Sequence, residues 1–407
     1  MARARARPRV VIAGRRPFLR AAATLAFAAL LLGTAALGAL GYGRDGGPHF
    51  SHQYPPNPVK LERPKARGPA PVAPQSNTLS GPQQIGSLAQ LAALLPHGVL
   101  RPVADRTWLL TQPVALTRGA TLAVAGASLE IGPNAFLEAR TQGRIALTSS
   151  SVSGVDEQGQ PLASPVPQRG FLAARDGGKL LLRDDRITDL GHLGVVSYGI
   201  SFRRPGPGSA VADSTIRGNY FGIFLSHAAG VAITGNRVLD SHVYGIDPYG
   251  YSHDVLIARN LVLNSGLHGI ILADHVSDTS VVGNVVDGAH AHGIVLFRYS
   301  SGNALTGNKI AHTFDGIVLT DSSSNRLSEN AVEHVVRFGI RASGRSEHNH
   351  LERNSFSAAL LGVYLYGGAA HNELIDSIFS KNRENVRVRS DAPHNIVSPV
   401  PPLSELG

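Results

Sequence analysis

The chain has 407 residues, a formal net charge of +9 and no cysteine, so disulfides, thiolate metal sites and cysteine nucleophiles are excluded. Seven of its arginines fall within residues 1–41, which hold no acidic residue, and the rest of the chain carries 31 basic and 29 acidic residues. This balance removes the main electrostatic argument for a nucleic-acid partner, and we expect none. The 45 glycines and only 6% aromatic residues favour many short strands joined by tight turns.

Residues 1–41 are predicted to be an export signal or a membrane anchor. The uncharged run AAATLAFAALLLGTAALGAL at 21–40 is about long enough to span a bilayer core, so membrane contact is expected only through residues 21–40 and only if they are not cleaved. The preceding RRPFLR at 15–20 resembles the twin-arginine export consensus, which implies a bacterial protein exported in the folded state to the periplasm or the cell exterior. An ordinary secretory signal or an uncleaved anchor is the alternative.

Residues 42–84 are rich in Pro, Gly, Arg and Ser and are predicted to form an extended, disordered linker. The stretch SLAQLAALL at 87–95 is typical of a short helix, which we expect to cover the first coil of the domain that follows. That domain is predicted over 85–397, and a tail over 398–407.

A motif of one polar or aromatic residue followed by Gly-Ile or Gly-Val recurs at steps of 23 or 24 residues, at Gly199, Gly222, Gly245, Gly269, Gly293, Gly316, Gly339 and Gly362. A second column follows at Asn236, Asn260, Asn284, Asn308, Asn330 and Asn354. Helical repeats would not tolerate a glycine at the same place in every unit, so the spacing predicts an all-β, right-handed parallel β-helix with about 23 residues per coil. We expect each asparagine to sit at a bend in a left-handed backbone conformation, with its amide bonded to the neighbouring coils.

Strand alternation sorts the residues around each glycine. Residues one and three places after it should point into the coil, and those one place before, two after and four after should point outward and form columns on one face. The outward columns on successive coils hold Phe224, then Tyr244, Asp247 and Tyr249, then His268, then His292. The turn just beyond brings His227, Asp274 and Arg298.

A groove with these side chains suits an extended acidic polymer. Removal of a proton from the carbon beside a carboxylate requires a cation or acid to stabilise that carboxylate, a base on one face of the sugar, and a donor for the returning proton. Tyrosine has a usual pKa of about 10, so a tyrosine base requires a neighbouring cation, for which Arg298 or a protonated histidine is the candidate. The paired aspartates that hydrolysis needs are not evident, since Asp184 and Asp185 lie early in the stack.

Four segments resemble the mannuronan C5-epimerases, particularly the periplasmic type of the alginate-secretion machinery: TDLGHLGVVSYGISF (188–202), YGIDPYGYSHDVLIARN (244–260), HGIILAD (268–274) and HGIVLFRYSSGN (292–303). The resemblance covers about 100–385 and implies a right-handed β-helix that inverts C5 of mannuronate residues within a polymer. Tyr244 and Asp247 match the family, and Arg298 matches an arginine of the periplasmic type. Tyr249 stands where the family's Y-G-x-D-P-H pattern has a catalytic histidine. Asp274 stands where the periplasmic type has an arginine and close to a functional aspartate of the secreted, calcium-dependent type.

Three functions are therefore carried forward: a C5-epimerase-like enzyme on an acidic polysaccharide, which we favour, a uronan lyase, which shares the same first proton abstraction, and a non-catalytic polysaccharide-binding or secretion module. The predicted catalytic residues are Tyr249, Tyr244, Asp247 and His268. The predicted substrate-binding residues are Arg298, His292, Asp274, His227, Phe224 and His253. No metal or cofactor is predicted, since no acidic ladder indicates calcium, and the protein is expected to be a monomer.

Overall fold

The computed structural model describes residues 76–398 apart from 161, 163–167 and 195–196, together with 41–42 and 48–49. The chain divides into two compact units, residues 1–71 and 72–407. In the first unit, β1 (Gly41–Tyr42) and β2 (Pro48–His49) pair antiparallel. The predicted export segment lies outside the described residues except for Gly41, and the predicted tail except for Ser398. No helix within the described residues is long and apolar enough to cross a membrane.

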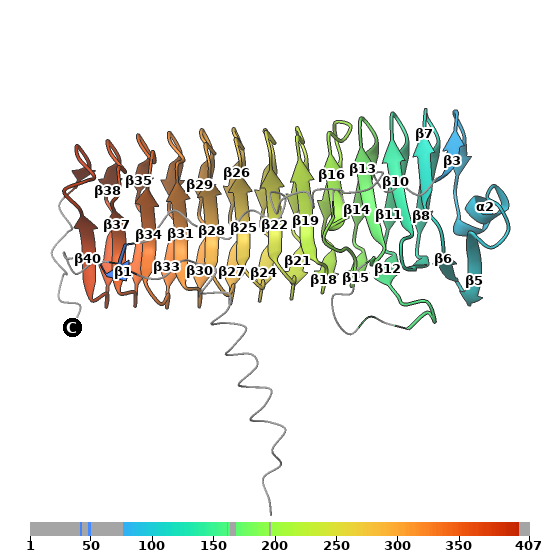
Figure 1. The fold of residues 1–407 in the computed structure, drawn as a ribbon, viewed down its shortest axis with the longest axis horizontal. Helices are drawn as coiled ribbons and strands as arrows, with labels where there is room; N and C mark the ends of the chain where they lie inside the picture. The colour runs from blue at the N-terminus through green and yellow to red at the C-terminus, as the bar shows by residue number, and fades with distance from the viewer. Residues whose placement is uncertain are drawn as a thin grey trace, which may run out of the picture. The chain divides into compact units, whose positions relative to one another are not determined.

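The second unit is a parallel β-solenoid built from three sheets of 13 strands each, in which successive coils add one strand to every sheet. Figure 1 shows the strands of the first sheet following one another in chain order from β3 to β40. About 23 residues separate equivalent strands, as the spacing of the glycines predicts.

Sheet 1 contains β3 (Asn77–Ser80), β7 (Val114–Thr117), β10 (Phe136–Arg140), β13 (Phe171–Arg175), β16 (Gly199–Arg203), β19 (Phe221–Ser226), β22 (Tyr244–Tyr249), β25 (His268–Ala273), β28 (His292–Phe297), β31 (Asp315–Thr320), β34 (Phe338–Ser343), β37 (Leu361–Leu365) and β40 (Glu384–Val388).

Sheet 2 contains β4 (Gln84–Ile85), β8 (Thr121–Ala125), β11 (Arg144–Thr148), β14 (Lys179–Arg183), β17 (Ala210–Ala212), β20 (Ala232–Thr234), β23 (Leu256–Ala258), β26 (Ser280–Val282), β29 (Ala304–Thr306), β32 (Arg326–Ser328), β35 (His350–Glu352), β38 (Glu373–Ile375) and β41 (Ile396–Val397).

Sheet 3 contains β5 (Leu100–Ala104), β6 (Thr107–Leu110), β9 (Ser128–Ile131), β12 (Ser151–Gly154), β15 (Arg186–Thr188), β18 (Thr215–Arg217), β21 (Arg237–Leu239), β24 (Leu261–Leu263), β27 (Val285–Asp287), β30 (Lys309–Ala311), β33 (Ala331–Glu333), β36 (Ser355–Ser357) and β39 (Ile378–Ser380). Only β5 runs antiparallel to its neighbour in this sheet, at the edge beside β6.

The core is formed by the residues that alternation predicts to point inward. Ile294 and Leu296 of β28 are fully buried, and Ile294 lies in register between Ile270 and Ile317 of the adjacent strands. Like side chains therefore stack on one another along the axis, which gives a continuous apolar core at the spacing of the coils. The predicted inward and outward positions of sheet 1 are confirmed.

The repeated glycine has a steric cause. A Cβ atom placed on Gly293 would lie 2.3 Å from Cγ2 of Ile310 in the same coil and 2.7 Å from the carbonyl oxygen of Gly316 in the next. No side chain fits at these distances, because the strand of sheet 1 passes directly over a core residue of sheet 3 at this point. The motif therefore marks a close approach between chain segments.

The asparagine column forms the expected ladder, with one correction. Asn284 donates through its amide nitrogen to Oδ1 of Asn308 and to the carbonyl of Ile257, both at 2.9 Å, and its own Oδ1 accepts from the backbone N–H of Asn260 at 3.0 Å. The left-handed residue is not the asparagine but the one before it, as Gly283 with φ 61° shows. The bend precedes the asparagine because its side chain must turn inward to reach the adjacent coils.

The solenoid begins before the predicted boundary at residue 85. β3 pairs in parallel with β7, with Asn77 opposite Val114, so the last residues assigned to the linker form the first strands of the stack. The predicted helix over 87–95 is confirmed as α2 (Leu88–Ala93), whose N-cap Ser87 accepts a hydrogen bond from the backbone N–H of Gln90 at 3.1 Å. Leu88 and Leu91 of this helix are buried in the solenoid core at its first coil.

Candidate functional site

Most of the predicted site residues meet on the outward face of sheet 1. Tyr244, His268 and His292 lie in register on β22, β25 and β28. Phe224 of β19 lies in register with Asp247. The expected open groove is not what the structure shows, because these side chains pack against one another and Tyr244, Asp247 and His268 are all less than 5% exposed.

Asp247 is the chemically most unusual residue of this face. It is 1% exposed, and neither carboxylate oxygen has a hydrogen-bond partner among the described residues. Burial raises the pKa of its carboxyl well above the ordinary value, because the charged form would lose its hydration without compensation. Burial therefore favours the protonated carboxylic acid at Asp247, which can both donate and accept a hydrogen bond.

Three phenols surround Asp247. Burial raises the pKa values of Tyr198, Tyr244 and Tyr249, and ionisation of Asp247 would raise each of them further. At neutral pH these phenols are all protonated. The centre of the face is thus a set of uncharged acids from which water is largely excluded.

Tyr249 differs from the other two phenols in its connection to the turn at the rim. Burial raises its pKa, the negative charge of Asp274 and a hydrogen bond to that carboxylate raise it further, and Arg298 opposes them with a weaker effect. Arg298 therefore acts in the direction that the sequence suggests but does not produce a resting tyrosinate. Asp274 is instead placed to accept the phenolic proton.

His268 and His292 belong to a second group of polar residues next to the first. The ring of His268 stacks on Tyr244 with centroids 5.3 Å apart and on His292 at 5.0 Å. Nδ1 of His292 lies 3.4 Å from Oδ2 of Asp315, which also accepts hydrogen bonds from Arg337 at 2.7 Å and from Arg341 at 2.8 Å. The Tyr244–His268 stack joins the two groups.

The two groups differ in charge. Burial lowers the pKa of His268 well below its ordinary value and that of His292 to about 3, so both rings are neutral at pH 7. Burial alone would raise the pKa of Asp315, but Arg341, His292 and Arg337 together lower it to about 2. The fully buried Asp315 is therefore ionised at pH 7, whereas burial of Asp247 favours its protonated form.

Asp315, Arg337 and Arg341 were not predicted from the sequence. Asp315 precedes its glycine in DGIVL, at the position that holds Tyr244 and the two histidines in earlier coils, so the repeat itself carried the signal. Arg341 occupies the same outward column as Asp247, four coils further along.

The rim beside Tyr249 carries a ladder of rings that includes one predicted residue. Tyr251 stacks on His275 with centroids 4.6 Å apart. His227 contacts Tyr251 at 5.7 Å and Tyr299 contacts His275 at 5.0 Å, both with tilted rings. Tyr251 and Tyr299 are more than half exposed. The structure does not bring His253 to either buried group, since it lies in the turn past the rim and pairs with the adjacent Asp254 at 2.7 Å.

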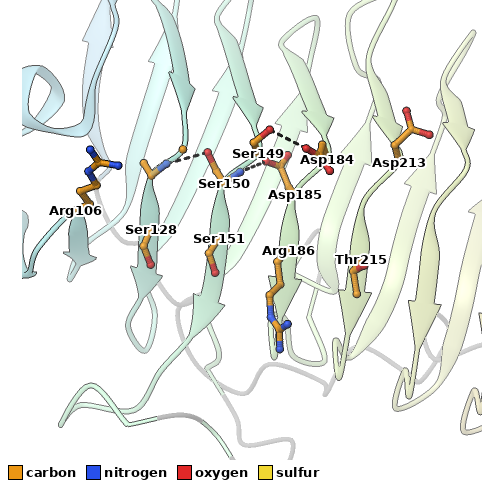
Figure 2. Close-up of a pocket in the computed structure, with 12 residues that line it drawn as sticks. Arg106, Ser128, Ser149, Ser150, Ser151, Asp184, Asp185, Arg186, Asp213 and Thr215 are labelled. Carbon is orange, nitrogen blue, oxygen red and sulfur yellow. Dashed lines mark hydrogen bonds between the residues drawn. The ribbon is translucent and has the colours of Figure 1, made fainter.

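A separate hollow of about 560 Å³ lies at the turns between sheets 2 and 3, where Asp184 and Asp185 are found (Figure 2). Asp185 accepts hydrogen bonds from the backbone N–H groups of Ser150 at 2.8 Å and Arg183 at 2.9 Å, and burial, opposed by these bonds, raises its pKa to about 6. It makes the same bond to the preceding coil that Asn236 makes to Ser214. Asp185 is thus the early counterpart of the asparagine ladder.

Within the described ranges, no three His, Cys, Asp or Glu side chains are grouped so that they could hold a metal ion. The chain has no cysteine and a single methionine, so soft ligands for copper are also nearly absent from its composition.

The family model of the periplasmic copper-binding protein NosD matches residues 183–360. The mannuronan C5-epimerase of Pseudomonas aeruginosa is 32% identical over 189 residues, which is 42% of this chain and 34% of that protein. The enzymes of Pseudomonas fluorescens and Azotobacter vinelandii are each 28% identical, over 187 and 188 residues, again 42% of this chain and 35% of theirs. The chain thus spans about a third of the length of these curated relatives.

The crystal structure of the periplasmic alginate epimerase AlgG superposes with a TM-score of 0.68 at 22% identity, covering 79% of this chain and 85% of that one. A double mutant of the same enzyme gives a TM-score of 0.70 at 22% identity, covering 79% and 84%. These solved structures share the β-solenoid fold. The sequence similarity adds homology to the mannuronan C5-epimerases. The family model names a copper-binding function, but the described residues contain no group of three His, Cys, Asp or Glu side chains that could hold a metal ion.

Proposed function

We propose that this chain is an exported enzyme that acts on an acidic polysaccharide and inverts C5 of uronate residues, as a mannuronan C5-epimerase-like isomerase on a right-handed β-helix. One observation carries the proposal: Asp247 is buried, has a raised pKa and has no hydrogen-bond partner in the described part of the chain, and it lies between Tyr244 and Tyr249 of the same strand. The homology to epimerases and the periplasmic location of the relatives support it.

The first requirement of the reaction is to stabilise the substrate carboxylate while its neighbouring carbon loses a proton. A neutral carboxylic acid in an apolar surrounding can donate a short hydrogen bond to an oxygen that gains negative charge. Asp247 fits this role, because its pKa is raised and its oxygens have no competing partner within the residues that the structure describes. Arg298, beside Tyr249, supplies a positive charge at the rim.

The second requirement is a pair of proton carriers on opposite sides of C5. In our proposal the phenol of Tyr249 takes the C5 proton as its own proton passes to Asp274, with which it is hydrogen-bonded. Tyr244, on the other side of Asp247, gives its proton to the opposite face of the carbon. The C5–H bond on one face is replaced by one on the other. Before the next cycle Asp274 releases its extra proton to solvent and Tyr244 regains one from solvent.

His268 and His292 position Tyr244 in this scheme. The neutral rings stack beneath the phenol, and Asp315 with its two arginines fixes the last ring of the stack. A histidine at the place of Tyr249 is thus not required for the reaction, because the Tyr249–Asp274 pair supplies a phenol and a proton acceptor.

The test is proton NMR of polymannuronate and other uronans incubated with the full-length protein in D2O. The proposal predicts that solvent deuterium appears at C5 together with signals of the inverted sugar. Absorbance of an unsaturated uronate product would instead identify a lyase. Binding without deuterium at C5 in any uronan would identify a binding module and refute the proposal.

A further inference from the structure

The outward column that contains Tyr249 holds a row of arginines on the N-terminal side. Arg140 of β10, Arg175 of β13 and Arg203 of β16 lie in register on consecutive strands of sheet 1. The column continues through Ser226 of β19 to Tyr249. We call Arg140, Arg175 and Arg203 the arginine track.

The track places like charges directly opposite one another, which is unfavourable for a sheet. Strands of one sheet lie about 4.8 Å apart, and like charges at facing positions destabilise the pair. Glu138 is the carboxylate that offsets the track, and it pairs with Arg140 and, at 3.5 Å, with Arg175. Arg203 has no ion-pair partner among the described residues, and the adjacent Arg204 pairs with Asp176 instead.

Donor groups of the track lack acceptors. The Nε atoms of Arg140 and Arg175 are buried without a hydrogen-bond partner in the part of the chain that is described. The guanidinium groups are nevertheless reachable, since the side chain of Arg140 is 37% exposed and that of Arg175 29%. A further sign of the positive field is His227, whose pKa is lowered by burial and then by Arg204 and Arg203.

The other end of the same strands offers an apolar surface. Phe136 of β10 and Phe171 of β13 stack with centroids 4.8 Å apart on the outward face. A uronic acid makes two kinds of contact: its carboxylate pairs with guanidinium groups, and its sugar ring packs against aromatic rings. The strands β10 and β13 carry guanidinium groups at one end and aromatic rings at the other.

We propose that the arginine track is a binding subsite for the carboxylates of an acidic polysaccharide that runs along sheet 1 and reaches Tyr249 from the N-terminal side. The inference rests on the proposed function, and extends it by giving the substrate a path. The three side chains start from strands about 4.8 Å apart, so their guanidinium groups form a row of positive charge along which an extended polyanion can lie. The coils beyond Tyr249 continue the column with Ala273, Phe297 and Thr320, which carry no charge, so the track binds one side of the reacting sugar only.

The test compares Arg203→Gln with Arg237→Gln in the full chain. Both changes remove one positive charge, and Arg237 is exposed on β21 of sheet 3, away from the track. Isothermal titration with polymannuronate oligomers of three and ten sugars should show that Arg203→Gln weakens binding of the longer chain roughly five- to tenfold, the range between an exposed ion pair and a charge-assisted hydrogen bond. The dependence of that binding on salt should also fall. Arg237→Gln should match the wild type, and the melting temperatures of both variants should stay unchanged.

The outcomes separate the two proposals. If binding depends on Arg203 but no deuterium appears at C5, the arginine track is supported as a binding subsite and the epimerase proposal is refuted. If deuterium appears at C5 and both variants bind the polymer equally well, only the proposal of the arginine track is refuted. Failure of the wild type to bind any acidic polymer would overturn the track.

Discussion

Replacement of Asp247 by valine should stabilise the protein and abolish its chemistry. The near neighbours of Asp247 in its outward column are apolar, with Phe224 on one side and Ile271 and Val295 on the other. Valine is close to aspartate in volume and has a high β-strand propensity, so the change leaves no cavity and suits the strand. A buried polar group without a partner costs about 1–3 kcal/mol, and this is the gain in unfolding free energy that we expect.

The gain should depend on pH with a definite sign. The pKa of Asp247 is raised in the folded state above its unfolded value of about 3.9. The unfolded chain therefore releases this proton first as the pH rises, and the wild type loses stability from about pH 4 up to the folded pKa, by at most about 1.4 kcal/mol per pH unit. The advantage of Asp247→Val should be smallest below pH 4 and grow above it.

Urea unfolding at pH 3.5, 5 and 7 would measure both effects, with Asp247→Asn as the control of equal shape. The asparagine variant cannot ionise, so it should lose the pH-dependent part of the penalty while keeping buried polar atoms. NMR in D2O should find no C5 exchange with the valine variant. A loss of more than about 1 kcal/mol for Asp247→Val at all three pH values would show that the carboxyl has a structural partner, and the reasoning would fail.

The remaining predictions concern the neighbouring aspartate and the repeated glycine. Asp315→Asn should lower the unfolding free energy by about 3–5 kcal/mol at pH 7, because Arg337 and Arg341 lose the anion between them. Since the folded pKa of Asp315 is about 2, the wild type should lose this advantage as the pH falls from about 4 to 2. An unchanged urea midpoint at pH 7 would contradict this prediction. Gly293→Ala should destabilise the protein by more than about 3 kcal/mol or prevent folding, because of the contacts at 2.3 and 2.7 Å. Gly307→Ala meets open space at φ 63° and should lower the unfolding free energy by only about 1 kcal/mol, through backbone strain. Equal losses in thermal melts would refute the steric explanation.

The solenoid could be predicted from the sequence because its determinants are local and repeated. Gly293 and its counterparts recur every 23 or 24 residues, and the inward residues that follow them form the core. The start of the stack was missed by eight residues, because β3 lies in a segment whose composition is dominated by the linker before it. Pairing with β7 across 37 residues stabilises this strand, and composition does not report such a distant partner.

The site could be predicted only in part. Alternation placed Asp247, Tyr249 and His268 on one face, since it depends on the direction of side chains alone. Alternation does not predict how deeply a side chain is buried. The raised pKa values of Asp247 and Tyr249 result from the packing of the surrounding side chains, which only the structure shows. The arginines around Asp315 were missed because each residue alone resembles an ordinary surface charge.

The central claim is that Tyr249 and Tyr244 carry protons on opposite faces of C5 around a neutral Asp247. The measurement that tests it most directly is deuterium incorporation at C5 of polymannuronate in D2O, followed for the wild type, Tyr249→Phe and Tyr244→Phe. The account predicts that Tyr249→Phe shows neither exchange nor inversion, and that Tyr244→Phe exchanges C5 hydrogen without forming the inverted sugar. Inversion at the wild-type rate by either variant would contradict it.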